Sequence, residues 1–535
     1  MIGINTLHTP IRRALISAYD KTGLITLSKA LIELGFQMIA TDGTAKFLLE
    51  HQFPVTSIED YTGFPEIMSG RVKTLHPKVH GGLLAQRFKD VMDIRAYDIQ
   101  PIDLLVVNLY PFTQTIQKSN CSLEEAIEQI DIGGATMLRA AAKNFHEVTV
   151  LIDPADYELV LNEMKCYQGA TTFSTRKKLA IKVFAELSKY NQSIAEYLEH
   201  SDACFPNETA SLFPKHYQPA YHKLMDLRYG ENPHQAAALY EDIINQPQLE
   251  GIAQAQLQQG KPLSFNNIVD SDAALECVRD LDSTLFACVI VKHATPCGVS
   301  QSNSQCDAYL QAYATDMQSA FGGIIAFNSL LKAATVETIL RQQFVEVLLA
   351  PNIEKTALRL LSSKPNIRVL IFSEKRPLDI KTYWKMHSLS DGLLLQEQDR
   401  KTVDSKDFNI VTKRQPTDAE REDLTFAWQV VKYVKSNAIV YAKNQRTLGI
   451  GSSTSRVFAA KIAKLKAEES GFLLNHAVMA SDAFFPFTDG IEVAARTGIR
   501  AVIQPGGSKR DAEVIAAANR YGMTMVFTAF RHFRH

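Results

Sequence analysis

A lysine and a histidine stand side by side at Lys292 and His293, directly after the apolar run Cys-Val-Ile-Val. Four apolar, mostly β-branched residues predict a buried strand, and Pro296 and Gly298 predict that the chain leaves this strand in a turn. The pair is therefore expected where a strand ends, a common place for side chains that face a cleft. A cation beside the histidine favours the free base, which can take a proton from a weak amine while the lysine stabilises negative charge. A strand end with a surface lysine and a hydrogen-bonded histidine is the simpler alternative.

A second polar group lies in residues 70–82, which end in Gly-Gly and are expected to form a loop. Its basic and imidazole side chains are Arg71, Lys73, His76, Lys78 and His80. Alternation along an extended segment puts Arg71 and Lys73 on one side, where both can hold one phosphate. A solvated basic loop is the alternative. A zinc site is excluded because neither histidine has a carboxylate or cysteine partner at metal spacing.

Two strand–turn–helix patterns precede this loop. Residues 14–18 and 36–40 are expected strands, and each is followed by a polar turn and a helical pattern. This order predicts a parallel sheet with helices on both faces. Both turns come at the carboxyl end of a strand, where the free N–H groups of a starting helix favour a phosphate. Ordinary capping by Asp20 and Thr41 explains the turns equally well.

A third strand is expected at residues 104–108, followed by Tyr110 and by a Ser122–Glu125 capping box. Asp131 and the diglycine Gly133-Gly134 then open a helix that carries Arg139 and Lys143. The diglycine permits close approach of the backbone to a ligand. Tyr110, Asp131 and Lys143 lie at or near the ends of elements, as catalytic groups often do. The alternative is that they are a tyrosine at the rim of the core, a helix cap and a solvated lysine.

The length and composition of the chain limit the class of protein to which it can belong. A length of 535 residues predicts about three or four domains. A formal net charge of −1 argues against a large nucleic-acid footprint, and no apolar run is long enough to span a bilayer. Seven cysteines without regular spacing indicate reduced thiols, and the first residues lack the order of a signal peptide, so a cytoplasmic protein is expected.

The second half contains further strand–turn–helix patterns after a domain boundary near residue 200. A polar loop is expected at 261–267, a helix from about Asp270, and a mobile connection over 401–421. Polar or aromatic side chains and one glycine at element ends are candidates for ligand contact: Arg228, Tyr229, Asn267, Gly322, Glu346, Asn437 and Phe485. Each has an ordinary structural explanation as a turn, cap or core residue.

Taken in order, these segments resemble the bifunctional AICAR transformylase/IMP cyclohydrolase family over nearly the whole chain. The stretch at Lys292 is similar to the family's Lys-His-x-Asn-Pro-Cys-Gly, with Thr295 where asparagine is usual. The segment Gly451–Arg456 is one residue shorter than the family's and lacks its glutamine, and Tyr19 and Asp42 replace smaller residues. The resemblance implies an α/β fold. A methylglyoxal-synthase-like parallel-sheet domain with cyclohydrolase activity is expected over 1–200, and two zinc-free cytidine-deaminase-like subdomains with transformylase activity over 201–535.

The resemblance also implies roles for single residues. The phosphate and ribose end of the cyclohydrolase substrate would be held by Ser17, Lys21, Thr41, Gly43, Thr44, Arg71, Lys73 and Thr74, with Gly133 also in contact. The reacting groups would be surrounded by Lys73, Tyr110, Asp131 and Lys143. In the transformylase half, His293 would be the base, Lys292 would assist it and Asn437 would touch the reacting groups. The nucleotide and folate pockets would be lined by Arg228, Tyr229, Asn267, Gly322, Glu346, Phe485 and Arg531.

The function implied is formyl transfer from 10-formyltetrahydrofolate to the amine of AICAR, followed by dehydration and ring closure of formyl-AICAR to IMP. No catalytic metal, nucleic acid or membrane is expected, and the family is a homodimer with transformylase sites across the subunit interface. Two alternatives remain. A deaminase-like hydrolase would need a metal-activated water, and a nucleotide-binding regulatory module would lack catalysis altogether.

Overall fold

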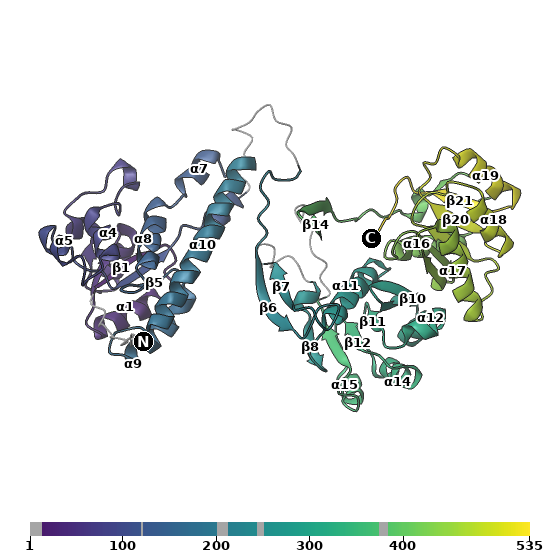
Figure 1. The fold of residues 1–535 in the computed structure, drawn as a ribbon, viewed down its shortest axis with the longest axis horizontal. Helices are drawn as coiled ribbons and strands as arrows, with labels where there is room; N and C mark the ends of the chain where they lie inside the picture. Colours follow the sequence, from purple (N-terminus) through teal and green to yellow (C-terminus); the bar gives the residue numbers. More distant parts are fainter. Residues whose placement is uncertain (1–12, 119–120, 201–211, 243–250, 374–383) are drawn as a thin grey trace. The chain divides into compact units, whose positions relative to one another are not determined.

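The chain folds into two compact units, residues Met1–Gln218 and Pro219–His535, in a computed structural model (Figure 1). The structure describes residues 13–118, 121–200, 212–242, 251–373 and 384–535. The domain boundary near residue 200 stays a prediction. Helix α10 (Phe173–His200) ends there, the following residues 201–211 lie outside the described part, and the two units divide at Gln218 and Pro219.

The first unit is built on a five-stranded sheet in the order β3-β2-β1-β4-β5. The strands are β1 Arg13–Ala18, β2 Gln37–Ala40, β3 Thr56–Ser57, β4 Leu104–Asn108 and β5 Thr149–Leu151. Every neighbouring pair is parallel, which confirms the parallel sheet expected from the strand–helix order. The carboxyl ends of β1, β2 and β4 therefore meet at one edge of the sheet.

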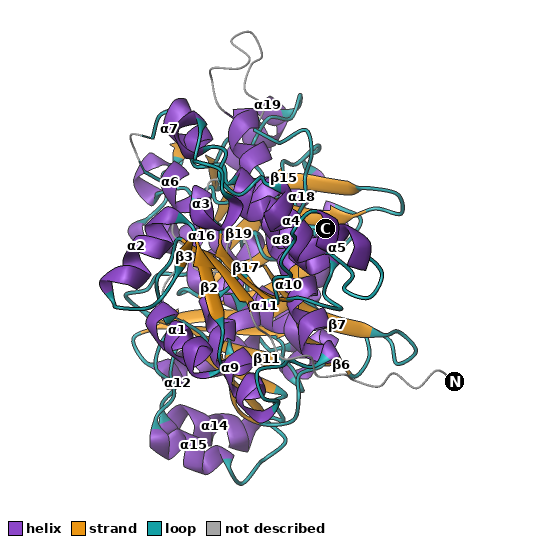
Figure 2. Cartoon of the chain, turned by 90° about the vertical axis from the view of Figure 1, so that its left-hand side faces the viewer, coloured by secondary structure: helices purple, strands orange, loops and turns teal. Residues whose placement is uncertain are grey.

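The strands of the first unit are connected by helices, which Figure 2 colours purple beside the orange strands. The helices are α1 Leu24–Glu33, α2 Asp42–Glu50, α3 Ile58–Thr62, α4 Pro77–Leu84, α5 Val91–Ala96, α6 Phe112–Ile116, α7 Leu123–Glu128, α8 Ile132–Lys143, α9 Tyr157–Cys166 and α10. The apolar spacing that predicted the helix after residue 24 is confirmed by α1, in which Leu24, Leu27 and Leu31 are buried. The capping box before α7 is also present.

The expected basic loop at 70–82 is only partly a loop, and this prediction was wrong over its second half. Helix α4 starts at Pro77, where a proline suits the first helical position, and the His76 ring accepts the N–H of Lys78 at 3.2 Å. The diglycine lies inside the helix. A Cβ on Gly82 would lie 2.7 Å from the carbonyl oxygen of Gln100, so the glycines allow close packing and do not end a loop.

The second unit is built on a twelve-stranded sheet in the order β16-β21-β20-β19-β17-β18-β10-β9-β11-β12-β13-β8, counted over the described residues. The strands are β8 Gln256–Gln259, β9 Phe286–Lys292, β10 Thr295–Ser302, β11 Ile324–Phe327, β12 Val347–Ala350, β13 Arg368–Ile371, β16 Asn409–Ile410, β17 Ala438–Lys443, β18 Arg446–Ser452, β19 Val478–Ser481, β20 Ala501–Gln504 and β21 Thr524–Phe527. Two separate hairpins are formed by β6 (Tyr221–Leu227) with β7 (Ala237–Asp242), and by β14 (Trp384–Ser388) with β15 (Leu393–Glu397).

This sheet contains the same sequence of elements twice. A helix, an antiparallel hairpin and then alternating helices and parallel strands run from α11 to β13, and again from α16 to β21. The helices are α11 Phe265–Asp280, α12 Gln305–Thr315, α13 Met317–Ala320, α14 Ala333–Gln342, α15 Lys355–Leu361, α16 Asp418–Val431, α17 Arg456–Glu469, α18 Asp489–Arg496 and α19 Asp511–Arg520. The repeats join where β10 pairs with β18. Two α/β subdomains are thus present, and their likeness to cytidine deaminase stays a prediction.

Both repeats place a glycine of the hairpin against the helix that follows it. A Cβ on Gly298 would lie 1.9 Å from the carbonyl oxygen of Ala312, and one on Gly449 would lie 2.0 Å from that of Ala463. The turn predicted at Pro296 and Gly298 was therefore wrong: both residues belong to β10, and the reversal occurs earlier, at His293 and Ala294.

Two further expectations were wrong at helix starts. Helix α11 begins at Phe265 because Ser264 and Asn267 form a capping box, so the polar loop ends earlier than expected. The connection expected over 401–421 contains β16 and the first turn of α16. There Thr417 and Glu420 form another capping box, and Arg414 pairs with Glu420 at 2.8 Å. The capping box and this ion pair hold the start of α16 in an ordered conformation, in contrast to the mobile connection that was expected.

Candidate functional site

Four of the residues assigned to the phosphate end meet where β1 and β2 end. The Thr41 hydroxyl donates to the Ser17 hydroxyl at 3.0 Å, and Thr44 Oγ1 contacts the Ala18 backbone. Lys21 Nζ donates to the Ala18 carbonyl and lies 3.2 Å from Thr44 Oγ1. Burial lowers the pKa of Lys21.

Helix α2 starts at this same place, since Thr41 is its N-cap and Gly43 lies in its first turn. Within the described residues no side chain caps this end, so the first N–H groups of α2 do not donate to an N-cap side chain. A helix of nine residues with hydroxyls and an ammonium group at its start offers the donors that a phosphate requires.

Lys73 joins a group of carboxylates beside this cluster. Its ammonium nitrogen lies 3.3 Å from Glu66 and 3.8 Å from Asp42, which is the first residue of α2. A hydrogen bond with Glu66 raises the pKa of Asp42 and lowers that of Glu66. The lysine that was assigned to the reacting groups is thereby placed next to the helix start that would hold the phosphate.

Asp131 is the N-cap of α8 and accepts the N–H of Gly134 at 2.6 Å. Burial raises its pKa, while Gly134, Lys73 and the backbone of Tyr110 act in the opposite direction. The Tyr110 backbone therefore contacts Asp131, and the charge of Lys73 favours the ionised carboxylate. Thr74 is also present, because a Cβ on Gly133 would lie 2.5 Å from its hydroxyl oxygen.

The two departures from the family pattern in this unit fall at the same place. Asp42 contacts Lys73, and the ring of Tyr19 packs edge-on against that of Tyr110 with centroids 5.6 Å apart. Both larger residues therefore touch side chains assigned to the reacting groups.

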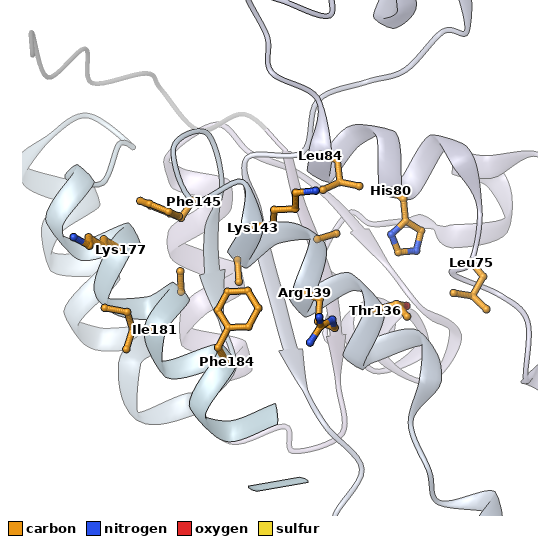
Figure 3. A pocket seen from close by; sticks show the side chains of 13 residues that line it. Leu75, His80, Leu84, Thr136, Arg139, Lys143, Phe145, Lys177, Ile181 and Phe184 are labelled. Atoms are coloured by element: carbon orange, nitrogen blue, oxygen red, sulfur yellow. The ribbon is translucent and has the colours of Figure 1, made fainter. Parts of the chain in front are cut away.

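Arg71 and Lys143 are not brought into this group. Arg71 forms an ion pair with Glu128 of α7, so Arg71 and Lys73 contact different carboxylates and do not share one side of an extended segment. Lys143 ends α8, and twelve residues of helix separate it from Asp131, about 18 Å along the axis. It lines an open, mostly apolar cavity with Arg139, His80 and Phe184 (Figure 3).

In the second unit, Lys292 lies beside Gly322 and not free in solvent. Its ammonium group donates to the carbonyl oxygens of Gly322 at 3.0 Å and Phe321 at 3.3 Å. Gly322 has a φ of 67°, a left-handed conformation that glycine adopts without strain. The lysine is thus held at the edge of the sheet where β9 ends and β11 begins.

Glu346 and Asn267 form the adjoining polar pair. Asn267 is buried and donates from Nδ2 to Glu346 Oε2 at 2.8 Å. The same carboxylate oxygen lies 3.8 Å from Arg368, a residue that sequence reasoning missed. The Glu346 N–H donates to the carbonyl oxygen of Gly323 at 3.3 Å. Lys292, Gly322, Glu346 and Asn267 are therefore neighbours.

His293 occupies the two-residue turn between β9 and β10, and its side chain is exposed. Both His293 and Ala294 are left-handed, with φ of 54° and 56°. The Asp270 carboxylate accepts the N–H of Ala294 at 2.6 Å and that of His293 at 3.3 Å. Thr295, the departure from the usual asparagine, lies with its hydroxyl 3.5 Å from the His293 carbonyl oxygen.

Asn437 belongs to a second group at the start of β17. Arg456 donates to Asn437 Oδ1 at 2.7 Å and to Asp482 Oδ1 at 3.0 Å, and Asp482 is fully buried. Ser436 connects this group to the C-terminal segment, because it donates to Asp482 at 2.6 Å and its backbone bonds to Arg534. Neither Arg456 nor Asp482 was assigned a role from the sequence, although Arg456 ends the Gly451–Arg456 segment quoted for the resemblance.

The two groups lie at one edge of the sheet but on different strands. β9, β10, β18 and β17 are antiparallel neighbours in this order, so β17 begins at the edge where β9 ends. Three strand spacings separate them, about 14 Å. Within one chain, His293 and Asn437 therefore do not reach the same small reacting group.

The remaining candidates lie elsewhere in this unit. Arg228 packs against the ring of Tyr229 at 5.6 Å just after β6, and Arg531 packs against Phe533 at 4.2 Å. Phe485 is a core residue with 2% of its surface exposed, whereas its neighbour Phe484 is 36% exposed. The core position of Phe485 was not evident from an aromatic cluster alone.

Within the described residues, no three His, Cys, Asp or Glu side chains are arranged to hold a metal ion. In the same part of the chain, no helix has the length and apolar character needed to cross a membrane.

A family model described as AICARFT/IMPCHase bienzyme matches residues 141–466, which is more than half of the chain. The chain belongs to this family. A second model, the MGS-like domain, matches residues 23–136, in agreement with the parallel sheet of the first unit. One solved structure, titled "Crystal structure of ForH", is 35% identical, covers 35% of this chain and 95% of its own, and has a TM-score of 0.32.

Membership establishes the two activities that the resemblance implied. The chain transfers a formyl group from 10-formyltetrahydrofolate to AICAR, and it closes formyl-AICAR to IMP. The hydrolase and regulatory alternatives are not supported by this match.

Proposed function

We propose that residues 1–200 carry out the ring closure and residues 201–535 the formyl transfer. One observation supports this division most directly: side chains that were assigned to one substrate from separate segments lie in contact. Ser17, Lys21, Thr41 and Thr44 form one cluster, Lys73 pairs with Asp42 beside it, and Asp131 accepts a hydrogen bond from the Tyr110 backbone.

In ring closure, nucleophile and electrophile belong to the same molecule, so holding the reactive conformer supplies much of the acceleration, up to about 7–11 kcal/mol. The hydroxyls, Lys21 and the start of α2 with Gly43 would fix the phosphate and ribose. Arg71, which pairs with Glu128, would join them only by leaving this ion pair. Thr74 and Gly133 would contact the ring. The carboxamide nitrogen attacks the formyl carbon, and Lys73 and Tyr110 polarise the formyl oxygen, which leaves as water after protonation.

Asp131 is suited to the proton transfers of this step. Burial raises its pKa, so the carboxyl exchanges a proton closer to neutral pH than a solvated aspartate does. It would accept the proton that the carboxamide nitrogen loses. Lys143 lies at the opposite end of α8, and we therefore leave it out of the reacting set within one chain.

In formyl transfer, the AICAR amine attacks the formyl carbon and its proton passes to His293. The bond between that carbon and the donor nitrogen breaks, and the donor nitrogen takes up a proton. Lys292, fixed by two carbonyl oxygens, would stabilise the negative charge on the formyl oxygen. Arg228, Tyr229, Asn267, Gly322 and Glu346 would line the adjoining pocket. The rings of Phe321 and Phe344, 5.7 Å apart and half exposed, offer apolar surface for a folate ring.

Asn437 belongs to the second group, about three strand spacings away, whereas Phe485 and Arg531 lie elsewhere in this unit. We therefore propose a homodimer in which the Lys292 group of one chain faces the Asn437 group of its partner. The separation of the two groups at one sheet edge supports this arrangement. A cytoplasmic location is also proposed, supported by the free thiols of Cys277, Cys288 and Cys297.

Product analysis by chromatography with mass detection tests these assignments. Wild-type protein given AICAR and 10-formyltetrahydrofolate should form IMP, His293→Ala should form it about 10²- to 10⁴-fold more slowly, and Lys73→Ala should accumulate formyl-AICAR. If His293→Ala still formed IMP at the wild-type rate, the assignment of the base would be wrong. If wild type closed formyl-AICAR but did not formylate AICAR, Thr295 and the short Gly451–Arg456 segment would be the residues to restore.

A further inference from the structure

The position of His293 depends on a backbone that the residue itself does not favour. His293 and Ala294 are both left-handed, a conformation that L-residues other than asparagine and aspartate disfavour because Cβ approaches the following carbonyl oxygen. A two-residue hairpin with both residues left-handed is normally built from asparagine and glycine. Some other interaction must hold His-Ala in this turn.

Asp270 supplies that interaction. It projects from the beginning of α11, and its two carboxylate oxygens accept one backbone N–H each, 2.6 Å for Ala294 and 3.3 Å for His293. Hydrogen bonds to a carboxylate are stronger than those between neutral groups. The bonds fix the turn and hence the point from which the His293 ring projects.

The same helix turn also orients the neighbouring pocket. Asn267 lies three residues before Asp270, a spacing that places both on one side of a helix. Asn267 bonds to Glu346 at 2.8 Å. The start of α11 thus sets both the turn that carries His293 and the carboxylate beside Lys292.

The second repeat contains the same arrangement without a histidine. Asp423 of α16 accepts the N–H groups of Asn444 at 3.0 Å and Gln445 at 2.7 Å, and both turn residues are left-handed, with φ of 53° and 52°. The turn and its aspartate therefore belong to the fold of each repeat. Only the first repeat places a base on the turn.

We propose that Asp270 is a positioning residue for formyl transfer, acting through His293. This inference rests on the proposed role of His293 as the base. It assigns to Asp270 a function that Asp423, its counterpart at a turn without a base, does not have.

The test compares Asp270→Asn with Asp423→Asn, two equivalent changes in one chain. In each, the amide accepts one N–H and presents an NH₂ group to the other. Asp270→Asn should lower the transformylase kcat about 10- to 100-fold with little change in KM for either substrate, since a misplaced catalytic group costs rate more than binding. Asp423→Asn should retain kcat within about twofold, and both variants should lose similar amounts of stability in thermal unfolding.

A double-mutant cycle with His293→Ala shows whether Asp270 acts through the histidine. If it does, adding Asp270→Asn to His293→Ala causes no further loss of rate. Multiplicative losses, or equal kcat losses in the two aspartate variants, would show that Asp270 has only a structural role. If the His293→Ala variant transferred formyl groups at the wild-type rate, the role of His293 itself would be wrong, which is an outcome distinct from those for Asp270.

Discussion

The two active regions of this enzyme are organised differently. In the first unit, hydroxyls, Lys21, Lys73 and Asp131 gather at one edge of a single parallel sheet. In the second, the His293 group and the Asn437 group lie on different strands about 14 Å apart. A reaction within one molecule needs one set of groups around it, whereas two substrates must be brought together. The contrast suggests one site complete within the chain and one completed by a partner.

The largest effects should separate the two activities. His293→Ala should reduce formyl transfer by about 10²- to 10⁴-fold, the usual contribution of a general base, and leave closure of supplied formyl-AICAR unchanged. Lys73→Ala should show the reverse pattern. Separate assays with AICAR and with formyl-AICAR measure each effect, and loss of both activities in either variant would contradict the separation.

Dilution should affect the two activities unequally. If the transformylase site needs two chains, its rate per chain falls as the dimer dissociates, while the cyclohydrolase rate per chain stays constant. Rates measured over a dilution series, with the molar mass followed by light scattering, give the comparison. A constant transformylase rate in a demonstrated monomer would contradict the shared site.

The pH dependence of ring closure should report Asp131. Because burial raises its pKa above the ordinary value, the carboxylate required as proton acceptor is lost as the pH falls through that raised pKa. The wild-type rate should therefore decline at a higher pH than a solvated aspartate would cause. Asp131→Asn preserves the helix cap but removes the proton acceptor. Ring closure in this variant should therefore be slower at neutral pH and should lack the decline at low pH. An unchanged pH profile would exclude the role.

The smallest effect is expected for Lys143→Ala. The residue ends α8, a helix length away from Asp131, so ring closure should change less than threefold, compared with a large loss in Lys73→Ala. Steady-state rates of ring closure with formyl-AICAR, measured for both variants, provide the comparison. A loss as large as that of Lys73→Ala would mean that Lys143 reaches the reacting groups, either from a partner chain or after a rearrangement.

Much of the first unit could be predicted because its signals are local. Alternating strands and helices determine a parallel sheet, and the helix start at Asp131, whose carboxylate caps α8, follows from its residue type. The α4 helix was missed because Gly81-Gly82 normally signals a turn. Gly82 is required by the carbonyl oxygen of Gln100 and Gly81 packs on the side chain of Ile99, contacts that no local pattern contains.

The second unit was harder because its key contacts connect distant segments. Because proline and glycine usually signal a turn, the turn was predicted at Pro296 and Gly298 instead of at His293 and Ala294. Both Pro296 and Gly298 belong to β10, and Gly298 packs on α12. Asp270 and Asp423 became visible only when the two repeats were compared in space. The burial of Phe485 likewise depends on neighbours far along the chain.

Mixing two inactive variants tests the central comparison most directly. If His293 and Asn437 of one site come from different chains, a dimer of one His293→Ala and one Asn437→Ala chain contains one intact site. Equal mixing with subunit exchange should then restore roughly a quarter of the wild-type formyl transfer. No recovery in a mixture shown to contain mixed dimers would place both residues in the site of a single chain and contradict the shared transformylase site.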